Sequence, residues 1–109
     1  MIGIDLSGRV VVITGATGEL GREMVRTFAE AEADVAICYH ENQGKAEELL
    51  DEVRAMGMKG MTVQADVTDE ESVFAMRDAV KATLGPADII VNNAVIQYKW
   101  VHVLKQATE

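Results

Sequence analysis

The segment of residues 10–21 constrains the fold of this chain more than any other. Four consecutive β-branched residues, Val10 to Ile13, run into a turn with glycines at positions 15, 18 and 21, and an amphipathic segment follows from Arg22. A continuous apolar run of this kind is typical of a central parallel strand buried on both faces. Strand, glycine-rich turn and helix in this order predict a phosphate-binding site, because the helix N-terminus offers N–H groups and a positive dipole end.

Each glycine of the turn has an expected role. Gly15 permits a tight turn, Gly18 lets the backbone approach a pyrophosphate, and Gly21 lets the helix pack closely on the strand. A glycine-rich turn that binds nothing is the alternative. The strand before the turn and the helix after it favour the phosphate site over that alternative.

The rest of the sequence predicts strands and helices in alternation. Apolar runs predict strands over residues 10–13, 34–39, 60–65 and 87–91. Apolar residues at three- and four-residue spacing predict helices over residues 19–33, 45–56 and 69–84. This alternation indicates parallel βαβ units, and hence an α/β fold with a partial doubly wound, Rossmann-like sheet of four strands in the order 3-2-1-4 and three helices.

Two local patterns support the helix assignments. The sheet-facing stripe of the first helix is expected to contain Leu20, Met24, Val25, Phe28 and Ala31. Residues 68–71, Thr-Asp-Glu-Glu, predict a capping box before the third helix, in which the Thr68 hydroxyl and the Glu71 carboxylate bond to backbone amides.

Composition limits the class of protein. A chain of 109 residues forms one domain at most, and its net charge of −8 argues against binding nucleic acid or anionic membranes. No apolar stretch has the length that spans a bilayer, and residues 1–7 lack the pattern of a secretory signal. The single cysteine, Cys38, fits a reducing compartment, so we expect a cytoplasmic protein.

Three motifs follow strands in register: residues 14–21, Thr-Gly-Ala-Thr-Gly-Glu-Leu-Gly; residues 65–67, Ala-Asp-Val; and residues 92–94, Asn-Asn-Ala. Together they make residues 5–96 resemble the short-chain dehydrogenase/reductase family. The resemblance implies NAD or NADP as cofactor. The residues implied to bind it are Gly15, Thr17, Gly18, Leu20, Gly21, Tyr39, His40, Asp66, Val67, Asn92 and Ala94.

The resemblance also implies a place for each part of the dinucleotide. Thr17, Gly18 and Leu20 would surround the adenosine ribose and the pyrophosphate. Asp66 would meet the adenine amino group, and Val67 would line the adenine pocket; a carboxylate that only caps the next helix is the alternative for Asp66.

The nicotinamide end and the choice of cofactor rest on fewer residues. Asn92 and Ala94 would support the nicotinamide-side ribose and the central sheet, with a simple polar turn as the alternative. Tyr39 stands where an acidic residue would bind the ribose hydroxyls of NAD, and His40 follows it, which leans slightly toward NADP.

Two residues depart from the commonest pattern of the family. The commonest branch of the family has a glycine at the position of Glu19 and a residue other than glycine at the position of Gly18. The Glu19 carboxylate is compatible with a bound phosphate only if it points outward. Val95 replaces the glycine after the Asn-Asn-Ala motif, and it should crowd the nicotinamide end slightly.

The catalytic residues implied by the family are missing. Hydride-transfer members carry a serine and a Tyr-x-x-x-Lys pair, whereas here Tyr39 precedes Gln43 by four residues and Tyr98 precedes His102. The only serines, Ser7 and Ser72, lie far from the expected position. The histidines and Cys38 are too few and too scattered for a zinc site.

We therefore interpret residues 1–96 as a Rossmann-like dinucleotide-binding half and residues 97–109 as a tail leading into a missing second half. The function implied is that of the N-terminal NAD(P)-binding portion of an alcohol or carbonyl oxidoreductase, inactive by itself. A non-catalytic nucleotide-binding or interaction module and a fragment complemented by a partner chain are the alternatives. The fourth strand would leave an unpaired edge, which predicts self-association or pairing with such a partner.

Overall fold

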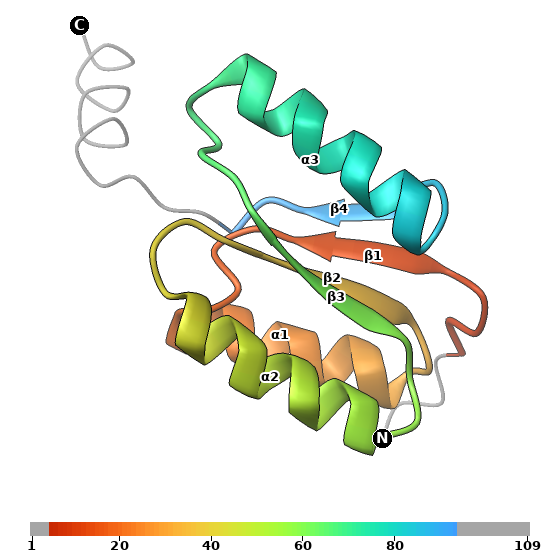
Figure 1. Cartoon of the computed structure of the whole chain (residues 1–109). Helices are drawn as coiled ribbons and strands as arrows, with labels where there is room; N and C mark the ends of the chain where they lie inside the picture. Colours follow the sequence, from red (N-terminus) through yellow and green to blue (C-terminus); the bar gives the residue numbers. More distant parts are fainter. Residues whose placement is uncertain (1–4, 94–109) are drawn as a thin grey trace, which may run out of the picture.

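The computed structural model describes residues 5–93, which form a parallel sheet between two layers of helices. Its elements in chain order are β1 (Val10–Ile13), α1 (Glu19–Glu30), β2 (Asp34–Tyr39), α2 (Gln43–Ala55), β3 (Gly60–Gln64), α3 (Glu70–Thr83) and β4 (Ile89–Val91). The four strands are parallel and lie in the order β3-β2-β1-β4. Helices α1 and α2 cover one face of the sheet and α3 covers the other (Figure 1). The predicted fold class and strand order are confirmed.

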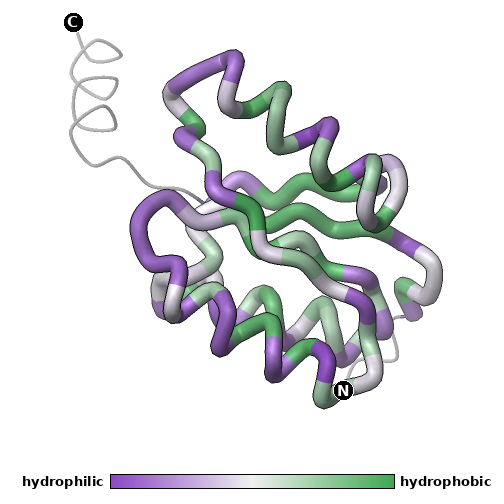
Figure 2. Tube along the Cα trace, viewed as in Figure 1, coloured by the Kyte–Doolittle hydropathy of each residue, from purple (hydrophilic) through white to green (hydrophobic). Residues whose placement is uncertain are grey.

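The apolar strands supply both halves of the core because alternate side chains point to opposite faces. Val11 and Ile13 of β1 pack in the cluster under α1 and α2. Val10 and Val12 pack in the smaller cluster under α3. All four side chains are buried, which explains why β1 reads as a continuous apolar run (Figure 2).

Helix α1 differs from its predicted form at both ends. It ends at Glu30 instead of residue 33, because Glu32 adopts a left-handed φ of 72° that turns the chain toward β2. At the other end Leu20 is 61% exposed, so its predicted place in the sheet-facing stripe is wrong. The buried residues of α1 are Gly21, Val25 and Ala29.

The predicted capping box before α3 is also wrong. The N-cap is Asp69, whose side chain accepts a hydrogen bond from the Glu71 N–H. The Thr68 hydroxyl donates instead to the carboxylate of Asp66. The cap is therefore one residue later than the pattern indicated, because Thr68 belongs to the turn that follows β3.

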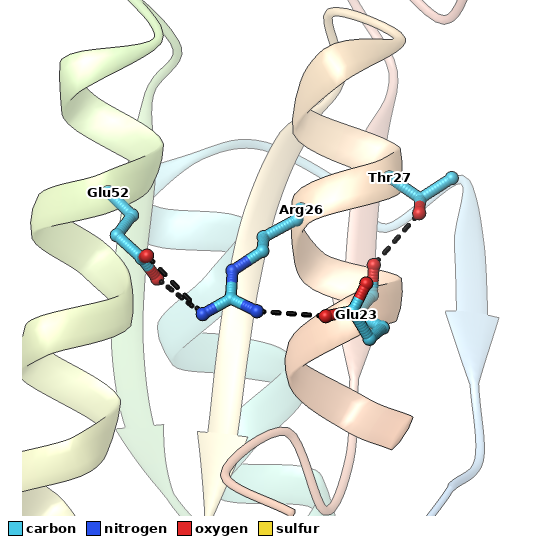
Figure 3. A network of polar contacts seen from close by, with 4 residues as sticks. All are labelled: Glu23, Arg26, Thr27 and Glu52. Atoms are coloured by element: carbon cyan, nitrogen blue, oxygen red, sulfur yellow. Dashed lines mark hydrogen bonds and ion pairs between the residues drawn. The ribbon is translucent and has the colours of Figure 1, made fainter. Parts of the chain in front are cut away.

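Helices α1 and α2 are joined by a polar network on the surface (Figure 3). The Arg26 guanidinium donates to both carboxylate oxygens of Glu52 at 3.3 Å and to Glu23 at 3.0 Å. Glu52, and to a smaller extent Glu23, raise the pKa of Arg26. The Thr27 hydroxyl donates to the backbone carbonyl of Glu23. The network links the surfaces of the two helices that lie side by side.

Candidate functional site

A cleft of about 710 Å³ opens at the carboxyl ends of the strands. Ligands of open α/β sheets bind at this edge, and the volume is within the usual range of small-molecule sites. Nine of the residues singled out from the sequence line it: Gly15, Thr17, Gly18, Leu20, Gly21, Tyr39, His40, Asp66 and Val67. The lining also includes Glu19, Cys38, Glu41, Asn42, Ala65, Thr68 and Asn93.

The three glycines of the turn are in three different situations. Gly15 has a φ of +62°, a backbone conformation that residues with a side chain rarely adopt. A Cβ on Gly21 would lie 2.3 Å from the Gly15 carbonyl oxygen, so only glycine lets α1 approach the turn this closely. A Cβ on Gly18 would meet only that same oxygen, at an ordinary 3.6 Å. The packing of the protein therefore requires Gly15 and Gly21 but would tolerate a side chain at Gly18.

The exposed Gly18 lies at the N-terminus of α1. Gly18 is the N-cap, and within the described residues no side chain caps the helix there. The first backbone bond of the helix runs from the Arg22 N–H to the Gly18 carbonyl, so the N–H groups before Arg22 have no partner within the helix. Leu20 and Glu19 beside them are exposed. The arrangement suits an anion, although Glu19 adds a carboxylate to the lining.

The end of β2 forms a second wall. Tyr39 is only 8% exposed and belongs to the core cluster, whereas His40 is exposed. Glu41 and Asn42 also line the cleft, and the sequence pattern did not single them out. Their position directly after Tyr39 and His40 was the signal that could have identified them.

The third wall is the turn after β3, where hydrogen bonds hold Asp66. The Asp66 carboxylate accepts hydrogen bonds from the Thr68 N–H at 2.9 Å and from the Thr68 hydroxyl at 2.6 Å. The Ser72 hydroxyl of α3 accepts from the Asp66 N–H at 2.9 Å. Because Asp69 is the N-cap of α3, the carboxylate of Asp66 orders the turn and does not cap the helix.

The fourth wall joins the glycine turn to the end of β4 through the buried residue Thr14. The Thr14 hydroxyl accepts a hydrogen bond from the Asn93 N–H at 2.9 Å and lies 3.2 Å from Oδ1 of Asn92. The Asn93 side-chain amide donates to the Gly15 carbonyl at 3.4 Å. Asn93 lines the cleft and Asn92 does not, while Ala94 lies outside the described residues. The sequence motif contained Asn93, but the resemblance pointed to its neighbours.

Cys38 of β2 also lines the cleft but is 1% exposed. Burial raises the pKa of its thiol to about 11, so the thiol is protonated at neutral pH and is a weak nucleophile. Among residues 5–93, no three His, Cys, Asp or Glu side chains are grouped so that they could hold a metal ion. No helix in this part of the chain is long and apolar enough to cross a bilayer.

The sheet order and the glycine turn define a Rossmann-like α/β protein, and comparison with known proteins gives the family. The family model described as short chain dehydrogenase matches residues 9–109. The chain therefore belongs to the short chain dehydrogenase family.

Individual relatives agree with this assignment. Glucose 1-dehydrogenase 2 of Bacillus subtilis is 31% identical over 83% of this chain and 35% of its own length. The 7alpha-hydroxysteroid dehydrogenase of Escherichia coli is 36% identical over 84% of this chain and 35% of its own length. The crystal structure of hydroxysteroid dehydrogenase from Escherichia coli superposes with a TM-score of 0.78 and 35% identity, over 84% of this chain and 39% of that one. The chain thus spans about a third of the curated relatives that it matches.

Proposed function

We propose that this chain is the N-terminal NAD(P)-binding portion of an oxidoreductase that interconverts an alcohol and a carbonyl by hydride transfer. The observation that carries the proposal is the N-terminus of α1, which no side chain among residues 5–93 caps and whose N-cap Gly18 lines a cleft of about 710 Å³. Unbonded helix amides at this position suit a pyrophosphate. The bound cofactor would supply the hydride donor or acceptor, and this chain would bind and orient it.

The adenosine part of the cofactor would lie across three walls of the cleft. Gly15 and Gly21 shape the turn, while Thr17, Gly18 and Leu20 surround the adenosine ribose and the pyrophosphate. Asp66 accepts a hydrogen bond from the adenine amino group, and Val67 lines the adenine pocket. Asn92 and Ala94 would support the nicotinamide-side ribose.

The proposed cofactor preference is slight and favours NADP. Tyr39 supplies no carboxylate to bind the ribose hydroxyls of NAD, and the adjacent His40 is exposed at the cleft. The carboxylate of Glu41 in the same wall keeps the preference small, because it repels a 2′-phosphate.

The 109 residues do not contain the serine and the Tyr-x-x-x-Lys pair in the expected place. Residues 1–96 form the dinucleotide-binding half and residues 97–109 lead toward the catalytic half, which carries the serine and the Tyr-x-x-x-Lys pair. The 109 residues alone are inactive, and the buried Cys38 thiol fits a location in the reducing cytoplasm.

The edge of β4 pairs with a second copy of the chain or with a complementing chain. Recovery of turnover on adding a chain with the missing catalytic residues would favour complementation. Stable binding without turnover would favour a non-catalytic module.

The experiment that tests the proposal compares Gly18→Asp with Gly44→Asp. Aspartate is a favourable N-cap, so Gly18→Asp should leave the thermal stability unchanged or slightly higher. Its carboxylate would occupy the position proposed for the phosphate and would repel a phosphate group. Gly44 lies in the first turn of α2, where an added Cβ would meet no atom within 4 Å, and it receives the same change in charge. In calorimetric titration with NADP and NAD, we expect Gly18→Asp to weaken binding at least about tenfold and Gly44→Asp to leave it unchanged. No binding by the unaltered chain, or equal binding by all three proteins, would reject the proposal.

A further inference from the structure

The turn after β3 holds Asp66 from two sides. Thr68 donates to its carboxylate oxygen Oδ1 through both its N–H, at 2.9 Å, and its hydroxyl, at 2.6 Å. Ser72, in the first turn of α3, accepts the Asp66 backbone N–H at 2.9 Å. One neighbour therefore orients the side chain of Asp66, and the other anchors its backbone to a helix.

These bonds have a consequence for recognition at the cleft. A carboxylate can accept several hydrogen bonds at once, so the bonds from Thr68 orient it without excluding a further donor. An acceptor that is already oriented loses little conformational freedom when a ligand binds. Asp66 and Thr68 both line the cleft, whereas Ser72 lies behind them on α3.

We infer that Thr68 and Ser72 are positioning residues that make the cleft select a 6-aminopurine over a 6-oxopurine. The inference rests on the proposed function and adds to it the residues that set base selectivity. An exocyclic amino group donates a hydrogen bond to the carboxylate, whereas an oxo group at the same position presents a second acceptor to it and makes no such bond. Selectivity depends on where the carboxylate points; Thr68 orients the carboxylate by its two hydrogen bonds, and Ser72 holds the backbone from which it extends.

The test compares the affinity for NAD with the affinity for its hypoxanthine analogue, which has an oxo group in place of the adenine amino group. Both ligands are titrated calorimetrically into the 109-residue chain and into Thr68→Val, Thr68→Ser, Ser72→Ala and Thr83→Val. Thr83→Val is the matched control, because Thr83 is exposed at the last residue of α3 and lies outside the cleft lining. The ratio of the two affinities is independent of the folded fraction, since both ligands bind the same folded molecules.

We expect the unaltered chain to prefer NAD about tenfold, because a hydrogen bond to a charged group is involved. Thr68→Val and Ser72→Ala should lower the ratio below about threefold, while Thr68→Ser and Thr83→Val keep it. The inference would be overturned if the unaltered chain bound both dinucleotides equally. It would also be overturned if Thr68→Val and Ser72→Ala, each tested singly, kept the full affinity ratio. Either result would leave the proposed function standing. Failure of the unaltered chain to bind either dinucleotide would overturn both.

Discussion

Cys38 makes the stability of the protein vary with pH in the alkaline range. Burial raises the pKa of its thiol from 9.0 to about 11. Between these values the unfolded state loses the proton and the folded state keeps it. The free energy of unfolding should therefore fall as the pH rises from 9.0 to about 11, by up to about 1.4 kcal/mol per pH unit. Below pH 9.0 the thiol is protonated in both states and contributes no slope.

The measurement is denaturant unfolding at several pH values for the unaltered chain and for Cys38→Ala. The variant removes the thiol but keeps a small apolar side chain in the cluster under α3. All other ionisable groups are the same in both proteins, so the difference between the two pH profiles isolates Cys38. Parallel profiles would show that the thiol has the same pKa in the folded and unfolded states.

Single residues of the cleft were predicted with uneven success. The need for glycine at positions 15 and 21 follows from the turn that a strand and a helix enclose, and the φ of Gly15 and the close approach at Gly21 agree with it. Leu20 was assigned to a buried stripe by its spacing alone, yet at the N-terminus of α1 this position faces the cleft. Spacing shows which residues share a helix face, but it cannot show how far along the helix the core extends.

Asn93 was overlooked, and Thr68 was given the wrong role, for a different reason. Their roles depend on partners in other segments or on backbone atoms: Asn93 bonds to Thr14 and to the Gly15 carbonyl, and Thr68 bonds to Asp66. A sequence shows that a polar residue is present. Only the folded chain shows which of several neighbouring polar residues meets the buried group.

At the scale of elements, α1 depends on its contact with the glycine turn. Gly21→Ala places a methyl group 2.3 Å from the Gly15 carbonyl oxygen and 2.7 Å from the Ala16 Cα, so the helix must shift away from the turn. We expect the free energy of unfolding to fall by about 1–3 kcal/mol, as in other overpacked sites. Urea unfolding measures the change.

The matched control for this prediction is Gly44→Ala in α2. A Cβ at Gly44 meets no atom within 4 Å, and alanine is the better residue in a helix, so we expect stabilisation by about 0.5–1 kcal/mol. Equal destabilisation by both substitutions would contradict the close approach at Gly21, because it would reflect a general intolerance of helix substitutions.

The elements themselves could be predicted almost completely, since their apolar periods are long and regular. Their ends could not. Strand β4 begins at Ile89 instead of residue 87, because the Asp88 side chain accepts the Val10 N–H at 2.9 Å in place of a strand carbonyl. Helix α2 ends just before Gly57, whose φ of +84° does not continue a helix. Ends set by glycine are visible in a sequence, whereas ends set by a distant side chain are not.

At the scale of the whole molecule, β4 lies at one edge of the sheet in the described part of the chain, and β3 lies at the other. Ile90, at the centre of β4, is 55% exposed, and apolar edge strands pair with other chains. We expect the unaltered chain to self-associate at high concentration and Ile90→Lys to weaken that association, because a charge on an edge strand opposes pairing. Sedimentation velocity over a range of concentrations measures the effect.

Phe74→Lys is the control for this prediction, since Phe74 is 49% exposed but lies on α3 and not on a strand edge. Equal effects of the two substitutions would indicate general hydrophobic association. A clean monomer of the unaltered chain at high concentration would count against any role of the β4 edge.

The bond from the Asn93 N–H to the Thr14 hydroxyl joins residues 79 positions apart in sequence. Closing a loop of that length costs about 4 kcal/mol of chain entropy. Neighbouring strands β1 and β2 meet over a much shorter separation, as the pairing of Val10 with Asp34 shows. On a ribosome, β1, β2 and β3 can therefore assemble while β4 is still being synthesised. The glycine turn is therefore synthesised well before β4, yet its bond to Asn93 can form only after β4 has been made.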